Sequence, residues 1–303
     1  MKATFAVAVS LAAALTPVFA QPQGPAAPEF IREGQRLVRE GKLDDALALY
    51  RETLKGAPNS IPANIGAGSV LDLMGKGTEA RTYFAKAIGA AQTPEEKAAA
   101  NRAMAMSYAF EANCEKTVEY EQRIFDIYAG QKNYYQQGEI ADEAARVCID
   151  SADFAAASKW YKTGHDVGLQ EPNISADRRD LWEFRWEHAQ ARLAARRGEA
   201  AEARRHVASA KALLDKGTNP QQQMFFPYLV GYVDLYTGDY RAALEQLQKA
   251  NQRDPFIQCL IGETYEKLGD KAQAMEYYRK AAAATSHNPP AAYAVPFARK
   301  KLS

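Results

Sequence analysis

The side chains that most often carry catalysis or hold a metal are thinly spread in this chain. It has only four histidines, and no two stand at the spacing of a metal-binding HExxH pair: His165, His188, His206 and His287. Neither a glycine-rich phosphate loop nor a GxSxG nucleophile elbow is present. The acidic residues are scattered in the manner of solvated helix faces. We therefore expect no enzyme activity, no metal and no cofactor. A hydrolase built from dispersed carboxylates is the least favoured alternative.

Charge and composition narrow the kinds of partner and fold. Lysine and arginine number 38 against 37 aspartate and glutamate residues, and the formal net charge is +1. That balance does not favour nucleic acid or an anionic membrane surface as a partner. Glycine and proline stand at intervals, and β-branched residues rarely follow one another. Because strands are rich in such residues, the composition favours an all-helical chain.

The first 20 residues have the pattern of a secretory signal peptide. Lys2 gives a positive start, an apolar run follows, and the small residue Ala20 stands before Gln21 at the expected cleavage site. An uncleaved membrane anchor is the alternative, but the run is shorter than the ~20 residues of a spanning helix. We expect residues 1–20 to be removed, residues 21–26 to form a flexible leader, and the mature chain to be periplasmic or secreted. No cysteine stands at the cleavage point for lipid attachment, and no later segment is apolar enough to span a membrane.

Small and aromatic residues recur at a fixed interval in the first third of the chain. Gly34, Leu37, Gly41, Ala46 and Tyr50 are followed 34 positions later by residues of the same kinds, at Gly68, Leu71, Gly75, Ala80 and Phe84. Small side chains let two helices cross closely, and an aromatic ring fills the space beside them. Glycine also tolerates the left-handed backbone that ends a helix. The interval therefore predicts repeated pairs of antiparallel helices.

This pattern resembles the tetratricopeptide repeat (TPR), a two-helix unit with small residues at the crossing, an aromatic beside them and a closing proline. It returns near the other end, with Gly231, Gly238, Ala243 and Pro255 in one unit and Gly262, Gly269, Ala274 and Tyr278 in the next. The middle of the chain keeps the rhythm with weaker matches. The resemblance implies an all-α, TPR-type α-solenoid, a right-handed superhelix of about seven helix pairs with a C-terminal capping helix.

The expected units follow from these anchors. The helix pairs are predicted near residues 27–60, 61–94, 98–131, 138–171, 184–217, 224–254 and 255–286. The pair Pro289 and Pro290 after Asn288 is typical of a helix start. Residues 287–303 are therefore expected to form a cap that lays Tyr293 and Phe297 on the last pair and leaves Arg299, Lys300 and Lys301 in water. A terminal repeat needs such a cover because its outer face has no neighbour.

Two of the three cysteines fall on neighbouring helices of the expected array. Cys114 opens the second helix of the third unit, and Cys148 lies in the first helix of the fourth. In an oxidising compartment a disulfide could join them and close a loop of about 34 residues. The alternative is that Cys114, Cys148 and Cys259 are three separate buried thiols that act as small apolar side chains.

The resemblance also implies a binding face, because the first helix of every unit lines the concave side of such a solenoid. The positions carried onto this sequence are Arg102, Met106, Phe110, Asp142, Arg146, His188, Arg192, Arg196, Tyr228, Tyr232 and Tyr236. Tyrosine and arginine are enriched at binding hot spots, and the three tyrosines share one helix face. We expect at least one of them to be exposed beside Arg192. The alternative is that the tyrosines pack between neighbouring units.

These observations favour a non-enzymatic scaffold outside the cytoplasm that holds a peptide or helix of a partner protein in its concave groove. A carbohydrate- or cell-wall-binding solenoid that uses the groove tyrosines as stacking platforms is the alternative from another class.

Overall fold

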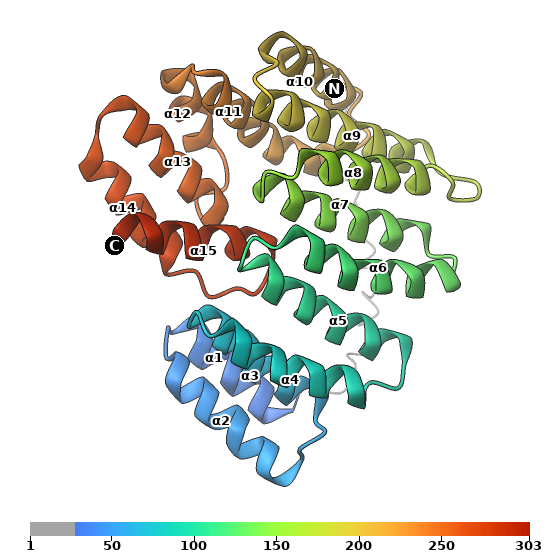
Figure 1. The fold of residues 1–303 in the computed structure, drawn as a ribbon. Helices are drawn as coiled ribbons and strands as arrows, with labels where there is room; N and C mark the ends of the chain where they lie inside the picture. Colours follow the sequence, from blue (N-terminus) through green and yellow to red (C-terminus); the bar gives the residue numbers. More distant parts are fainter. Residues whose placement is uncertain (1–27) are drawn as a thin grey trace, which may run out of the picture.

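Helices make up all the regular structure in the part of the chain that the structure describes. The structure is a computed structural model and describes residues 28–303, so the predictions for residues 1–20 and 21–26 lie outside it. Consecutive helices form seven packed pairs (Figure 1): α1 (Glu29–Arg39) and α2 (Leu43–Gly56), α3 (Ile61–Leu73) and α4 (Gly77–Ala90), α5 (Pro94–Ala109) and α6 (Cys114–Gly130), α7 (Tyr134–Asp150) and α8 (Phe154–Gly168), α9 (Ala176–Arg196) and α10 (Ala200–Asp215), α11 (Phe226–Thr237) and α12 (Tyr240–Lys249), and α13 (Pro255–Leu268) and α14 (Lys271–Ala282). A 3₁₀ turn, η1 (Pro220–Phe225), precedes α11, and a final helix, α15 (Pro289–Leu302), follows α14. The predicted all-α solenoid is confirmed. None of the helices within residues 28–303 has the length and apolarity to cross a membrane.

Within a pair, the two helices meet where a small residue faces a large ring. Gly68 on α3 lies so close to Phe84 of α4 that a Cβ atom at Gly68 would overlap the ring. Gly262 on α13 meets Tyr278 of α14 in the same way. Both rings are completely buried, and burial of a side chain of this size contributes roughly 1.5–3 kcal/mol. Gly68 and Gly262 are therefore points of close helix approach.

Trp182 joins one pair to the next by the same principle. It belongs to α9, and its ring lies against Gly138 of α7 and Gly168 of α8, where a Cβ atom would overlap the indole. Only 1% of Trp182 is exposed. The fourth and fifth pairs therefore stack through this side chain together with Ala189 and Leu193 of α9, which share one core cluster with residues of α7 and α8.

The helices end in two different ways. After α1 and α3 the chain turns through Gly41 and Gly75, at φ 74° and 78°, which glycine adopts without steric cost. In the middle of the chain, three turns after helices have a positive φ at a residue that is not glycine: Ala112, Lys132 and Ala152. In each case the next residue caps the following helix with its side chain: Asn113, Asn133 and Asp153. The glycine signal is missing there, although the turn has the same left-handed backbone.

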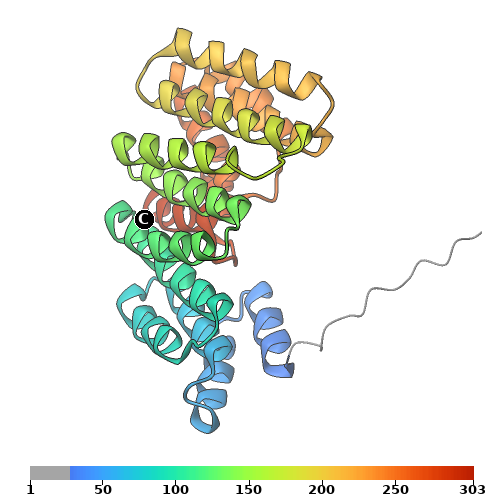
Figure 2. The same cartoon turned by 90° about the vertical axis from the view of Figure 1, so that its right-hand side faces the viewer.

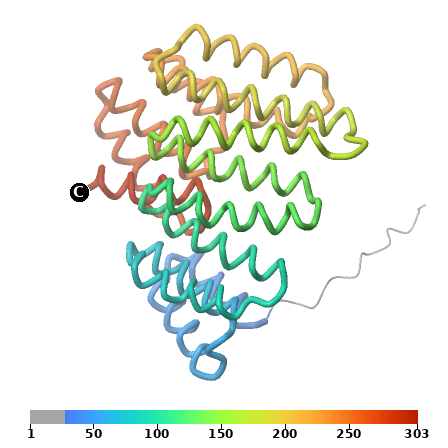
Figure 3. Tube along the Cα trace, turned by 45° about the vertical axis from the view of Figure 1, so that its right-hand side comes forward, coloured from blue at the N-terminus to red at the C-terminus, as the bar shows by residue number. Residues whose placement is uncertain are grey.

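The solenoid curves until its C-terminal end lies beside its own middle. Figures 1 and 3 show α15 next to α5 and α7, and the view of Figure 2 agrees. One face of α15 buries Ala294 and Ala298 against the last pair. Another face packs Ala292 against Met106 of α5 and Val147 of α7. The predicted cap therefore covers the last pair and also crosses the inside of the curve.

The segment before α15 holds the C-terminal end of the solenoid against the earlier helices. His287 Nε2 lies 2.8 Å from Asp72 Oδ2 on α3, a contact between residues 215 positions apart. The imidazole ring stacks on Phe110, with ring centroids 5.4 Å apart, and lies 5.6 Å from Phe84. Residues of α3, α4 and the end of α5 thus hold the C-terminal segment in place.

The basic end of α15 is only partly free in water. Arg299 and Lys300 are exposed. Lys301, which was expected to face water, instead donates to Glu266 Oε2 of α13 at 2.6 Å. This ion pair ties the last turn of the chain to the last helix pair.

Cys114 of α6 and Cys148 of α7 are joined by a disulfide, with their Cα atoms 4.8 Å apart. Of the two alternatives that the sequence left open, the structure contains the bridge. Cys259 is a buried free thiol. The bridge ties the third helix pair to the fourth.

Candidate partner-binding groove

Three cavities adjoin one another along the inner side of the curve. The first, of about 430 Å³, lies between α1 and α3, and the second, of about 490 Å³, lies among α3, α5, α6 and α7. The third, of about 540 Å³, lies among α5, α7, α9 and α11. The first and second share Ile65, Ser69 and His287, and the second and third share Arg102 and Asn288. We call this continuous row the inner groove. Each cavity has the volume of an ordinary ligand pocket.

The C-terminal segment of the chain forms one wall of the inner groove. Residues 285–290, which comprise the end of the connection after α14 and the first two residues of α15, contribute to all three cavities. Thr285 lines the first, His287 the first and second, and Pro290 the third. In the sequence, this stretch indicated only the start of a helix. Its place in the groove depends on the curvature of the whole solenoid, for which the stretch has no local signal.

Two ion pairs neutralise most of the charge that lines the third cavity. Arg102 Nε donates to Glu143 Oε1 at 2.9 Å, and a second nitrogen of the guanidinium contacts Glu143 Oε2. Arg185 pairs with Glu139 and lies 4.0 Å from Asp142 Oδ2. Burial raises the pKa of Asp142 to about 7. The Asp142 carboxyl is therefore only partly ionised near neutral pH.

Arg192 is held by phenols and not by carboxylates. Its Nη2 donates to Tyr161 Oη at 2.6 Å, and its Nη1 donates to Tyr228 Oη at 3.4 Å. Arg192 is only 6% exposed, and burial raises the pKa of Tyr161, so the phenol stays neutral. Burial, together with the nearby Arg192, lowers the pKa of His188 well below its usual value. These neighbours orient the guanidinium without neutralising it.

Arg146 is the second arginine of the third cavity without an acidic partner. Its guanidinium carbon lies 5.0 Å from the centre of the Phe256 ring. Its Nε and the Nε of Arg192 are buried and have no hydrogen-bond partner among the residues that the structure describes. Asp150 lies near both arginines but forms no ion pair within 4.0 Å in residues 28–303, and burial raises its pKa to about 6. Both guanidinium groups therefore lack a direct ion pair beside the cavity, although the Asp150 carboxyl interacts with their charges from a greater distance.

The structure brings most of the predicted groove residues together. Six of them line the third cavity: Arg102, Asp142, Arg146, His188, Arg192 and Tyr228. Met106 lines the second cavity. The other four lie at the edge of the groove or deeper in the protein: Phe110, Arg196, Tyr232 and Tyr236.

The expectation of an exposed tyrosine beside Arg192 is wrong. Tyr228 is 7% exposed and Tyr232 is fully buried. Both rings pack on Phe256 of the next pair, with centroids 6.1 and 6.5 Å away. Tyr236 is half-buried, and the guanidinium carbon of Arg196 lies 4.8 Å from its ring centre. The tyrosines therefore pack between neighbouring units, which is the alternative that the sequence left open.

An exposed aromatic side chain that the sequence analysis missed stands at the third cavity. Phe225, at the end of η1, is 44% exposed and lines this cavity together with Gln222. Its neighbour Met224 is 58% exposed. The only signal in the sequence is a run of three apolar residues, 224–226, after the polar run of residues 221–223. Phe225 falls inside the predicted unit at residues 224–254, but it was not placed among the groove residues.

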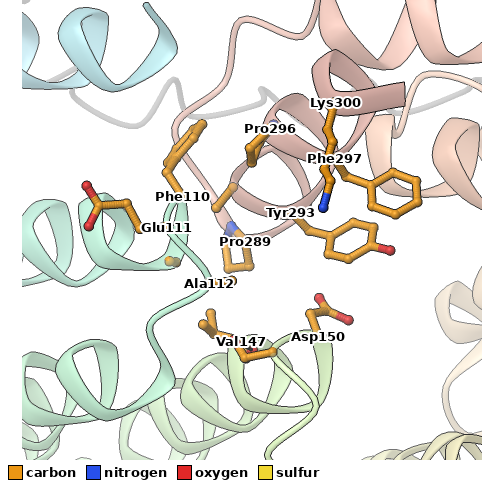
Figure 4. Close-up of a pocket in the computed structure, with 13 residues that line it drawn as sticks. Phe110, Glu111, Ala112, Val147, Asp150, Pro289, Tyr293, Pro296, Phe297 and Lys300 are labelled. Atoms are coloured by element: carbon orange, nitrogen blue, oxygen red, sulfur yellow. Dashed lines mark hydrogen bonds between the residues drawn. The ribbon is translucent and has the colours of Figure 1, made fainter. Parts of the chain in front are cut away.

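A fourth cavity, of about 330 Å³, adjoins the groove at Pro289 (Figure 4). Phe110 and Val147 form one wall, and Phe297 of α15 forms the other. Lys300 lines its edge. The lining is mainly apolar, so this cavity is suited to an apolar side chain beside the groove.

Glu121 on α6 carries a carboxyl group that is buried in the protein interior. It is completely buried, and neither of its oxygens has a hydrogen-bond partner among residues 28–303. Burial, with a smaller effect of Glu143, raises its pKa well above the usual 4.5. The folded protein therefore keeps a proton on Glu121 that the unfolded chain loses above about pH 4.5, so this group lowers stability as the pH rises.

Replacing Glu121 by glutamine is expected to stabilise the protein at about pH 8 by at least about 1 kcal/mol, because a buried charge is costly. The gain should shrink near pH 4, where wild-type Glu121 is protonated in both states. Urea unfolding at the two pH values measures it. Glu119→Gln is the matched control, since Glu119 is exposed on the same helix and its hydrogen bond with Lys116 lowers its pKa. Destabilisation of Glu121→Gln at about pH 8 would contradict the argument.

Comparison with known families identifies the repeat near both ends of the chain. Models of the tetratricopeptide repeat match residues 31–103 and residues 257–288. The sequence has no match among curated proteins. The two matched ranges contain the pairs in which Gly68 meets Phe84 and Gly262 meets Tyr278.

Solved structures resemble this chain at low sequence identity. Apo RapI is 12% identical, with 90% of this chain and 97% of that chain covered and a TM-score of 0.55. A tetratricopeptide repeat protein from Parabacteroides merdae ATCC 43184 is 15% identical, with 84% and 91% covered and a TM-score of 0.49. A chain of the APC/C hetero-tetramer Cut9-Hcn1 is also 15% identical, but this protein spans only 45% of it, with a TM-score of 0.46. The RapI likeness concerns the fold alone. From the two family matches and the paired helices, the chain is an all-helical solenoid that contains tetratricopeptide repeats, a fold that typically serves as a protein-interaction scaffold.

Proposed function

We propose that this protein is a non-enzymatic scaffold outside the cytoplasm, and that it holds a peptide or helix of a partner protein in the inner groove. The observation that carries the proposal is the continuity of the three cavities, which adjoin through shared residues from α1 to α11. An elongated ligand could contact all three cavities at once, whereas a small molecule would fill one.

The chemistry of the groove changes along its length in a way that suits a polypeptide. The first cavity is lined by apolar side chains such as Val38 and Val70. The third combines arginines with the exposed ring of Phe225. A partner segment with apolar side chains at one end and polar side chains at the other would match both ends, and partly exposed aromatic and arginine side chains are the usual anchors of such contacts.

Carbohydrate binding through the groove tyrosines is less favoured. A sugar ring stacks on an aromatic face that solvent can reach. Tyr228 and Tyr232 offer no such face, because both are buried against the next helix pair.

The location outside the cytoplasm rests on the signal-peptide pattern of residues 1–20. The disulfide between Cys114 and Cys148 supports it, because disulfides persist in oxidising compartments and are rare in the cytosol. The redox state of this pair in living cells is therefore a test of the location.

Photo-crosslinking in the native host tests the groove directly. We expect p-benzoylphenylalanine at Gln136 or Gln222, which line the second and third cavities, to capture a discrete partner protein. The matched controls are Gln122 on α6 and Lys162 on α8, which are exposed on second helices away from the three cavities. The same partner captured equally from all four positions, or only from the two controls, would refute binding in the groove.

A further inference from the structure

We infer that the third cavity of the inner groove binds a carboxylate group of the partner segment between Arg146 and Arg192. The inference rests on the proposed function, because it names the chemistry that the same groove recognises. It concerns a negatively charged side chain, glutamate or aspartate, that the partner carries into the cavity.

The first support is the set of unpartnered donors. Both Nε atoms are buried without a hydrogen-bond partner among the described residues. A buried donor that stays unpaired costs about 1–3 kcal/mol, and more when it belongs to a charged group. Arg192 is only 6% exposed and lines the cavity with Arg146. Both Nε atoms are shielded from solvent, so a ligand completes their hydrogen bonding when the guanidinium groups shift as it binds.

The second support is the way in which the charged side chains of the cavity wall pair with one another. Arg102 pairs with Glu143, and Arg185 pairs with Glu139, so these arginines are already neutralised. Arg146 lies over an aromatic ring, and Arg192 donates to phenols. Neither has a carboxylate oxygen within 4.0 Å in residues 28–303, and the Asp150 carboxyl, whose pKa their charges lower, lies farther away. A buried charge needs a partner of opposite sign to offset its desolvation.

The third support decides which anion fits. The planar guanidinium group matches the two oxygens of a carboxylate. A phosphate would bring a second negative charge into a cavity that is also lined by Glu139, Asp142 and Glu143. A monoanion satisfies Arg146 and Arg192 with less repulsion from these acids. The exposed ring of Phe225 offers a contact for an apolar side chain next to the acidic residue.

The test uses short blocked peptides and the whole folded protein. The probes are acetyl-Ala-Phe-Glu-Ala-Ala-amide, its glutamine counterpart, and the glutamine peptide with a free C-terminal carboxylate. The readout is the ¹⁵Nε–¹Hε signals of the arginine side chains. We expect the glutamate peptide to shift the signals of Arg146 and Arg192 and to bind roughly tenfold or more tightly than the blocked glutamine peptide. A response to the free C-terminus alone would overturn the assignment of the carboxylate to a side chain.

Matched variants complete the test. Arg146→Gln is expected to weaken binding of the glutamate peptide roughly tenfold, whereas Arg102→Gln, in the same cavity but paired with Glu143, should change it less than about twofold. Unchanged melting temperatures would show that both variants fold. Equal binding of all three peptides, or no shift at Arg146 and Arg192 up to about 10 mM peptide, would overturn the inference. If the peptides fail to bind but p-benzoylphenylalanine at Gln136 still captures a partner, only the carboxylate inference is wrong. If neither is observed, the proposed function is wrong as well.

Discussion

Replacing Trp182 by alanine is expected to lower the free energy of unfolding by about 3–5 kcal/mol. The ring is 1% exposed and fills the space that Gly138 and Gly168 leave between the fourth and fifth helix pairs. Neighbouring pairs in a solenoid stabilise each other only through such interfaces. Removing the indole therefore opens a cavity at a joint of the array. Urea unfolding followed by circular dichroism measures the loss.

Two variants sharpen this prediction. Trp182→Phe should cost less than the alanine variant, because it keeps an aromatic ring and because the indole Nε1 has no hydrogen-bond partner among residues 28–303. Trp186→Ala, on the same helix but only half-buried, should also cost less. A loss below about 1 kcal/mol for Trp182→Ala, or a loss no larger than that of Trp186→Ala, would show that stacking through Trp182 does not hold the two pairs together.

Removing the disulfide by the double substitution Cys114→Ala and Cys148→Ala is expected to cost roughly 3–4 kcal/mol, if chain entropy dominates. The bridge closes a loop across a sequence separation of 34 residues, and its loss gives that freedom back to the unfolded chain. Thermal melting with and without dithiothreitol measures the effect. The wild type should melt lower in dithiothreitol, and the double variant should not respond. Cys259→Ala, which removes only the buried free thiol, should keep the full response to dithiothreitol.

The same bridge reports the cellular location. If the protein is exported, thiol alkylation of acid-quenched and denatured cell samples should label only Cys259, because Cys114 and Cys148 are oxidised together. Labelling of all three cysteines in the native host would contradict export. A wild-type melting curve that dithiothreitol leaves unchanged would contradict the stabilising role of the bridge.

The sequence predicted the fold where helix packing requires particular residue types at a short, fixed spacing. Gly68 and Phe84 stand 16 residues apart and meet within one pair, so their types and spacing alone indicate the crossing. In the middle of the array, Ala112, Lys132 and Ala152 have the positive φ that glycine usually provides. Repeat patterns that count glycines are therefore weak there, although the helices stack in the same way.

The groove was only partly predictable because its walls depend on the curvature of the whole solenoid. A helical pattern placed Tyr228 and Tyr232 on one face but could not show that Phe256 of the next pair covers that face. The contact between His287 and Asp72 joins residues 215 positions apart and has no periodic signal. Arg146 and Arg192 were found because the repeat pattern fixes which helix faces inward. Their lack of acidic partners appears only when their three-dimensional neighbours are known.

The most direct test of the account is hydrogen exchange of the protein alone and in complex with the partner captured by crosslinking. Backbone amides of the first helices that line the inner groove, α3, α5, α7 and α9, and of residues 285–288 should gain protection on binding. Those of α4, α8 and α10 should change little. Protection confined to these second helices, with the inner groove unchanged, would contradict the central claim that the concave face holds the partner.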